Sequence, residues 1–158
     1  MGMKQTVALI LHNIRSTHNV GSLFRTADCA GVGELFLCGY TPTPIDRFGR
    51  ARSDVAKVAL GAEKTIPWQQ HEDTLLLLKK LKKDGYRIIA LEQSERSVHF
   101  KKIIVEGKTA LVVGNEVGGI EEALLAHCDD IAEIPMAGEK ESLNVSVAAG
   151  VALFAWLT

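Results

Sequence analysis

The sequence lacks the features that would place it in or across a membrane. Its longest apolar stretch, residues 145–157, contains Gly150 and is shorter than the roughly 20 residues that a helix needs to cross a bilayer. The N-terminus has no basic region followed by an apolar one and a cleavage site, so nothing indicates export. We therefore expect a cytoplasmic protein with no membrane partner.

Cysteine and histidine are too few and too scattered for a disulfide framework or a metal site. The three cysteines are odd in number and show no Cys-x-x-Cys spacing. No two of the five histidines are four residues apart, the spacing that would put both on one helix face. We expect buried free thiols and no bound metal.

An excess of positive charge, common in nucleic-acid-binding proteins, is also missing, since the formal net charge is −1. The total hides an asymmetry, because the first 60 residues carry seven Lys or Arg against four Asp or Glu. Five of those seven are arginine, which binds phosphate through two parallel hydrogen bonds. They are Arg15, Arg25, Arg47, Arg50 and Arg52. Contacts to an RNA backbone are one interpretation, and a solvated loop with incidental charge is the other.

The length of 158 residues, with 47% hydrophobic and 23% charged residues, fits one globular domain without an extension domain. Apolar runs of strand length alternate with helical patterns. The sequence predicts strands over residues 6–12, 34–38, 64–67, 86–91, 109–113 and 130–134. It predicts helices over residues 19–30, 55–60, 72–84, 121–127 and 145–157. This alternation favours an α/β fold with a mostly parallel sheet and helices on both faces.

Two segments suggest contacts beyond this domain. Residues 39–54 contain Pro42, Pro44 and Gly49 beside the arginines, which predicts a long exposed loop. The helix over residues 145–157 is apolar nearly all round. Such a helix must be covered on every side, which favours a partner subunit.

Three polar segments stand out as a possible site: residues 19–28, 113–119 and 134–146. The second follows a buried strand, and its glycines let the backbone approach a ligand closely. The third leads into the last helix, whose first N–H groups are free to bind a ligand or a capping side chain from Ser142 or Asn144. A P-loop is excluded because no Gly-Lys-Ser/Thr follows the glycines. A Rossmann fingerprint is excluded because the segment 31–33 precedes a strand and lacks the third glycine.

Taken in this order, the three segments resemble the motifs of the SpoU/TrmH family, the RNA ribose 2'-O-methyltransferases of the SPOUT superfamily. The resemblance runs from about Leu9 to the C-terminus. It implies a C-terminal trefoil knot and a homodimer formed through the last helix and the helix after the first strand. It also implies S-adenosyl-L-methionine as the cofactor, held mostly by backbone groups of two loops.

The resemblance implies roles for individual residues. The implied cofactor-binding residues are Gly114, Asn115, Glu116, Ile134, Met136, Ser142 and Leu143. The implied catalytic residues are Arg25, Asn19, Glu116, Ser142 and Asn144. Arg25 would bind the phosphate next to the target ribose and stabilise the developing alkoxide, because a guanidinium stays protonated and is no base. The structural alternative is a salt bridge to Asp28, since an arginine in an apolar helix pattern is costly unless paired.

The implied substrate is RNA and not DNA, because the 2'-hydroxyl itself accepts the methyl group. Without terminal extensions, recognition would come from the dimer surface, with Arg15 and the loop arginines as candidates, and we expect tRNA ahead of rRNA. Two alternatives stay open. The chain could be a non-catalytic RNA-binding or assembly module on the same fold, or a doubly wound protein that binds another nucleotide.

Overall fold

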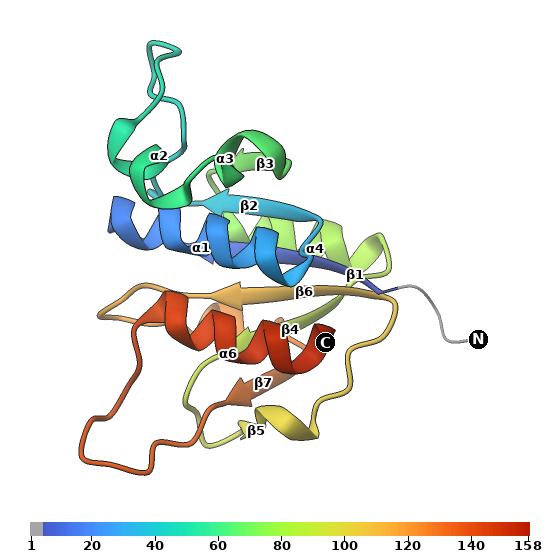
Figure 1. The fold of residues 1–158 in the computed structure, drawn as a ribbon. Helices are drawn as coiled ribbons and strands as arrows, with labels where there is room; N and C mark the ends of the chain where they lie inside the picture. The colour runs from blue at the N-terminus through green and yellow to red at the C-terminus, as the bar shows by residue number, and fades with distance from the viewer. Residues whose placement is uncertain (1–4) are drawn as a thin grey trace.

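The computed structural model describes residues 5–158 as one parallel sheet between two layers of helices (Figure 1). The 7-stranded sheet has the order β3-β2-β1-β6-β4-β7-β5, and all its strand pairs are parallel. The strands are β1 (Thr6–His12), β2 (Glu34–Cys38), β3 (Trp68–His71), β4 (Arg87–Leu91), β5 (Val98–His99), β6 (Lys108–Val113) and β7 (Asp130–Glu133). This confirms the predicted mostly parallel sheet.

Helices cover both faces of the sheet, as predicted. They are α1 (Thr17–Ala30), α2 (Ser53–Ala59), α3 (Ala62–Thr65), α4 (Thr74–Lys83), α5 (Glu122–Leu125), α6 (Val145–Leu157) and the 3-10 helix η1 (Phe100–Lys102). Alternate residues of β1 point to opposite faces: Leu9 and Leu11 pack with α1 and α6, whereas Ala8 and Ile10 pack with α4 and α5. Figure 1 shows α1 and α6 across one face of the sheet.

The strand predicted over residues 64–67 is wrong. Gly61, with φ +96°, starts the short helix α3 there. Pairing with β2 begins only where the Pro67 carbonyl accepts a hydrogen bond from the Leu35 N–H at 2.9 Å. β3 therefore follows at Trp68–His71, a polar segment at the edge of the sheet without the apolar run that strand prediction relies on.

Two burial predictions also need correction. The loop after β2 is exposed at its tip, but Thr41 and Thr43 at its base are buried. Their hydroxyls donate to backbone carbonyls, that of Thr41 to Leu11 at 3.0 Å and that of Thr43 to Ile45 at 2.6 Å. Of the three free thiols, Cys38 is buried, but Cys29 is exposed on α1.

Within residues 5–158, the structure shows no helix long and apolar enough to span a bilayer. The same residues contain no group of three or more His, Cys, Asp or Glu side chains arranged to hold a metal ion.

Candidate active site

A cavity of about 970 Å³ opens at the carboxyl edge of the sheet, where β4, β6 and β7 end. The segments that follow these strands form most of its wall. Ligand sites in parallel α/β sheets lie at this edge, and the volume is in the range of small-molecule sites, about 300–1,000 Å³. The seven residues predicted to bind the cofactor all line it: Gly114, Asn115, Glu116, Ile134, Met136, Ser142 and Leu143.

The loop after β6 folds back on itself because Gly114 has no side chain. A β-carbon at this position would lie 2.5 Å from Ile120 Cγ1 and 2.6 Å from the Gly119 carbonyl oxygen. The loop is closed by backbone hydrogen bonds of 2.9 and 3.1 Å between Asn115 and Gly119. The Asn115 side-chain oxygen accepts from the backbone N–H groups of Val117 and Gly118. The wall of the cavity is therefore ordered by its own hydrogen bonds.

Three side chains join the three polar segments in one hydrogen-bonded chain. The Glu116 carboxylate accepts from the backbone N–H groups of Arg15 and Ser16 and from Asn19 Nδ2, each at 3.0 Å. The other side-chain atom of Asn19, Oδ1, accepts from Asn144 Nδ2 at 3.1 Å. Asn19 is buried, so these contacts fix the start of α1 against both cavity loops.

Asn144, and not Ser142, is the cap of α6. Its Oδ1 accepts from the backbone N–H of Ser146 at 2.9 Å and from that of Val147 at 3.4 Å, while its Nδ2 bonds to Asn19. One side chain thus caps the helix and joins the polar network. Ser142 lines the cavity and is exposed.

The hydrogen bonds around Glu116 shift its acidity. Partial burial alone would raise the pKa of Glu116, but the three donors from Arg15, Ser16 and Asn19 outweigh it and lower the pKa below its ordinary value of 4.5. A group whose folded-state pKa is depressed stabilises the fold above its unfolded-state pKa. It loses that contribution as the pH falls through the folded-state pKa.

Glu116→Gln is therefore expected to lower the free energy of unfolding at pH 7 by about 1 kcal/mol, because an amide accepts these hydrogen bonds less strongly than a carboxylate. The difference from the unaltered protein should shrink as the pH falls below 4.5 and through the lower folded-state pKa, where the native carboxylate protonates. Urea unfolding at pH 7 and at a series of pH values falling from 4.5 measures this change. Glu139→Gln, in the exposed loop after β7, is the matched control and should leave the free energy of unfolding unchanged at neutral and at acidic pH. An equal loss for Glu116→Gln at all these pH values would contradict this reading.

Arg25 does not line the cavity. It lies exposed on α1 in a separate shallow hollow between α1 and α6. Within residues 5–158 it forms no ion pair, so the alternative of a salt bridge to Asp28 is wrong. A salt bridge was expected because a buried arginine is costly unless it is paired. Since Arg25 is exposed, its charge can stay unpaired at little cost.

The other arginines occupy two places. The backbone of Arg15 contacts Glu116 beside the cavity, and its side chain is exposed. Arg47 and Arg50 lie together at the tip of the loop after β2, while Arg52 is half-buried at the start of α2. The structure therefore groups Arg47 with Arg50 and leaves Arg15 on the connection between β1 and α1.

The sequence interpretation missed the segment 91–96, which forms another wall of the cavity. The Glu92 carboxylate accepts from the Ile120 N–H at 3.0 Å, and Gln93 Nε2 donates to the Glu141 carbonyl at 2.6 Å. This segment thus bonds to both of the other cavity loops. Its position directly after a buried parallel strand was the available signal.

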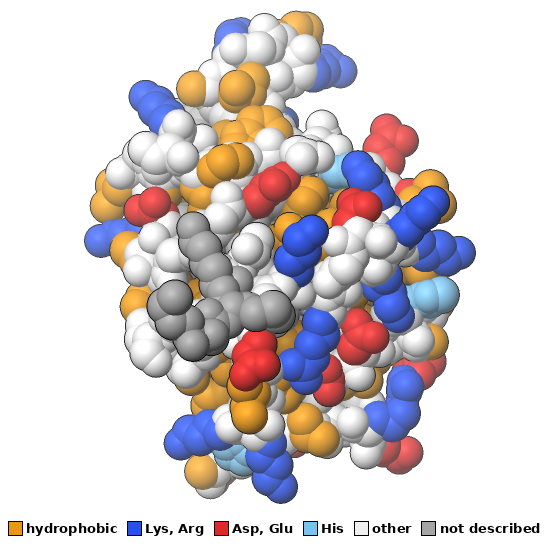
Figure 2. All heavy atoms as spheres, turned by 90° about the vertical axis from the view of Figure 1, so that its right-hand side faces the viewer, with side chains coloured by type: hydrophobic (Ala, Val, Ile, Leu, Met, Phe, Trp, Pro, Cys, Tyr) orange, Lys and Arg blue, Asp and Glu red, His pale blue; other side chains and the backbone are white. Residues whose placement is uncertain are grey.

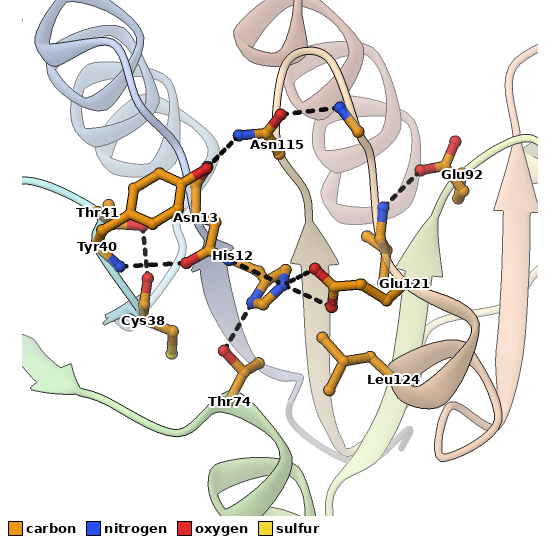
Figure 3. A network of polar contacts seen from close by, with 12 residues as sticks. His12, Asn13, Cys38, Tyr40, Thr41, Thr74, Glu92, Asn115, Glu121 and Leu124 are labelled. Carbon is orange, nitrogen blue, oxygen red and sulfur yellow. Dashed lines mark hydrogen bonds and ion pairs between the residues drawn. The ribbon is translucent and has the colours of Figure 1, made fainter.

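His12 was also missed, because the histidines were considered only as metal ligands. It is buried at the end of β1, with Nδ1 2.7 Å from Thr74 Oγ1 and Nε2 2.9 Å from both carboxylate oxygens of Glu121 (Figure 3). Glu121 immediately follows the cavity segment that ends at Ile120. The contacts therefore fasten the end of that segment to β1 and α4.

Comparison with known proteins agrees with this geometry. The chain matches the model of the SpoU rRNA Methylase family over residues 6–154. It belongs to this family. A curated relative, the 23S rRNA (guanosine-2'-O-)-methyltransferase RlmB of Xylella fastidiosa, is 37% identical over 151 residues, which are 95% of this chain and 57% of that protein. The chain thus spans less than two thirds of that relative.

Solved structures of similar proteins agree with the fold. The AdoMet bound rRNA methyltransferase from Sinorhizobium meliloti superimposes with a TM-score of 0.86 and 25% identity, over 98% of this chain and 57% of that one. A structure described as giving insights into the 2-OH methylation of C/U34 on tRNA has a TM-score of 0.78 and 26% identity, over 95% of this chain and 93% of that one. The predicted SpoU/TrmH resemblance and the α/β fold are confirmed.

Proposed function

We propose that this chain transfers a methyl group from S-adenosyl-L-methionine to a ribose 2'-hydroxyl in RNA. The observation that carries the proposal is the hydrogen-bonded chain Glu116–Asn19–Asn144, which joins all three family segments at one cavity. The name of the Xylella fastidiosa relative and the AdoMet bound neighbour from Sinorhizobium meliloti support the same reaction and cofactor.

The cavity suits S-adenosyl-L-methionine in size and in the kind of groups it offers. Ile134, Met136 and Leu143 supply apolar contacts for a flat ring, and the backbone of the segment 114–119 supplies polar groups close to the ligand. The cofactor would bring a methyl group on a cationic sulfur, which leaves as a neutral thioether. The protein then has to act mainly on the acceptor.

A ribose hydroxyl is barely acidic, so the protein must orient it and stabilise the charge that develops on its oxygen. We assign the orienting role to Asn144, held by Asn19, with Ser142 and Glu116 at the same cavity. We assign the charge role to Arg25, which would bind the neighbouring RNA phosphate. A guanidinium stays protonated, so the proton passes to a phosphate oxygen or water.

We infer that the protein is a homodimer formed through α1 and α6. Val147, Val151 and Phe154 are 51%, 39% and 41% exposed on α6, and they line the hollow that contains Arg25. Three neighbouring exposed apolar side chains on one helix favour an interface. The adjacent residue Ala148 lines the cavity, so the proposed interface borders it and a partner's Arg25 could complete the site.

Val151→Glu is expected to convert the dimer to monomers, because a charge buried without a partner costs several kcal/mol, or roughly a 100-fold rise in the dissociation constant. Light scattering at several protein concentrations measures the mass. Leu76→Glu is the matched control, since Leu76 is a 63% exposed apolar residue on α4, on the other face of the sheet. A dimer that survives Val151→Glu, or a monomeric unaltered protein, would refute this interface.

The expected preference for tRNA over rRNA is not supported, because the curated relatives are named for 23S rRNA. We therefore propose rRNA as the first substrate to test and tRNA as the second. Radiolabelled S-adenosyl-L-methionine is incubated with protein-free 23S rRNA and, separately, with total tRNA, and calorimetry measures cofactor binding. Label in either RNA supports the proposal. If neither RNA is labelled and no cofactor is bound, the alternative of a non-catalytic RNA-binding or assembly module is favoured.

Further expectations stay proposals. We propose that residues 1–158 form a single methyltransferase domain, of which residues 1–4 lie outside the described range. We propose that the segment leading into α6 forms the trefoil knot of the family, and the match to the SpoU family model and to the rRNA methyltransferase structure from Sinorhizobium meliloti supports this. Cytoplasmic location likewise stays a prediction.

A further inference from the structure

The loop after β2 forms a hairpin that projects from the molecule beyond α2 (Figure 1). Ile45 and Ala51 form an antiparallel bridge, and the Asp46 N–H donates to the Arg50 carbonyl at 2.8 Å. The tip of this hairpin therefore consists of residues 46–50. The hairpin follows the end of β2, at the carboxyl edge of the parallel sheet, and the cavity opens at the same edge.

Asp46 holds the tip in one conformation. Its Oδ1 accepts from the backbone N–H groups of Phe48 at 2.8 Å and Arg50 at 3.0 Å, and its Oδ2 accepts from Arg50 Nε at 3.2 Å. Gly49, with φ +79°, completes the turn in a backbone conformation that favours glycine. The conformation of the tip thus comes from its own hydrogen bonds and requires no ligand.

The hairpin presents an aromatic ring flanked by cations. Phe48 is 66% exposed, and the guanidinium carbons of Arg47 and Arg50 lie 4.7 and 5.0 Å from the centre of its ring. Figure 2 shows basic and hydrophobic side chains together at the top of the molecule, where the hairpin projects. A ring this exposed adds little to the core, so its contribution to folding does not explain it.

We propose that Phe48 is a stacking platform for an unpaired base of the RNA, with Arg47 and Arg50 binding the adjacent phosphates. The inference rests on the proposed function, because the RNA is the methyl acceptor. Proteins bind splayed bases of single-stranded loops by stacking them on aromatic rings and guanidinium planes, and they attract the backbone with cations. A base within a duplex cannot offer its face, so the platform selects a loop or bulge.

The base of the same loop touches the cavity. Asn115 Nδ2 donates to the Tyr40 hydroxyl oxygen at 2.6 Å, and the Tyr40 N–H donates to Asn13 Oδ1 at 3.1 Å. Phe48 follows Tyr40 by eight positions, so the Cα atoms of the two residues lie at most roughly 29 Å apart. The stacked base would then be a nucleotide near the target ribose and not the target itself. Phe48 would affect RNA affinity and KM, and not kcat.

The test compares RNA affinity of variants that separate the ring from the charges. Phe48→Leu keeps an apolar side chain without a π face, and is expected to weaken binding about 5- to 100-fold with an unchanged salt dependence. Phe48→Trp should bind within roughly twofold of the unaltered protein. Arg47→Gln should weaken binding and reduce the slope of log K against log salt by about one. The matched control is Leu76→Ala, a change at an equally exposed apolar residue.

Filter binding to protein-free 23S rRNA and to total tRNA at several salt concentrations gives these constants. Phe48→Leu binding both RNAs as tightly as the unaltered protein would overturn the stacking proposal. Equal losses for Phe48→Leu and Phe48→Trp would overturn it too, as would dissociation of a dimer by Phe48→Leu, which would assign the ring to a second copy of the chain. In each of these cases methyl transfer by the unaltered protein stays intact. If the proposed function itself is wrong, the unaltered protein transfers no label to either RNA.

Discussion

Replacing Arg25 with alanine should lower the rate of methyl transfer by about 100- to 1,000-fold, the usual loss when one charge-stabilising group is removed from an active site. The affinity for S-adenosyl-L-methionine should not change, because Arg25 lies outside the cavity that would hold it. Single-turnover rates with labelled cofactor measure the first quantity, and calorimetry measures the second.

Arg15→Ala is the matched control, since Arg15 is an exposed arginine whose backbone, and not its side chain, contacts Glu116. It should weaken RNA binding without a comparable loss of single-turnover rate at saturating RNA. Arg25→Lys keeps the charge but not the two-pronged geometry, and should recover only part of the rate. An unchanged rate in Arg25→Ala would remove Arg25 from the mechanism.

Mixed dimers test whether a partner subunit supplies Arg25. Equal amounts of Arg25→Ala and Gly114→Ala chains, unfolded and refolded together, should regain roughly a quarter of the activity if each site uses the partner's Arg25, because half of the dimers are mixed and each of those has one intact site. If each site uses the Arg25 of its own chain, the mixture should show no activity beyond that of the two variants measured separately. Thus the mixture distinguishes the two arrangements directly.

The second large effect is expected at Gly114. Alanine there would place its β-carbon 2.5 Å from Ile120 Cγ1 and 2.6 Å from the Gly119 carbonyl oxygen. The segment 114–119 must shift to relieve this overlap, which should cost about 1–3 kcal/mol of unfolding free energy. The same shift should displace the cavity wall and weaken cofactor binding by at least roughly tenfold.

Gly118→Ala provides the control within the same loop. A β-carbon there would lie 3.7 Å from Asn115 Oδ1, an ordinary contact distance, so stability and cofactor affinity should change little. Urea unfolding and calorimetry on the two variants make the comparison. Equal effects at Gly114 and Gly118 would show that the close approach at Gly114 does not shape the cavity.

The sequence predicted elements well where apolar residues form a nearly continuous run. β1, β2 and α6 have the predicted bounds, because each is a largely apolar segment with a clear end. It failed at residues 64–67, where α3 ends, and it missed the edge strand β3 that follows at Trp68–His71, because that strand buries too little to show a pattern. Periodicity reports burial, so an element that buries little leaves a weak signal.

The cavity could be predicted in part for a similar reason. The loops after β6 and β7 carry motif residues, and all seven predicted cofactor residues line one cavity. Glu92 and His12 act through hydrogen bonds to residues distant in the sequence, Ile120 and Glu121, and such pairings cannot be read from spacing. The exposure of Arg25 was missed because the pattern of apolar residues in α1 does not show whether a polar residue among them is buried or faces solvent.

The position of the methyl group on the product tests the central proposal most directly. RNA labelled from radioactive S-adenosyl-L-methionine is hydrolysed with alkali, which cleaves every linkage that has a free 2'-hydroxyl. If the chain methylates the ribose, the label should be found in alkali-resistant dinucleotides. Label released in mononucleotides would place the methyl group on a base and contradict the proposed reaction.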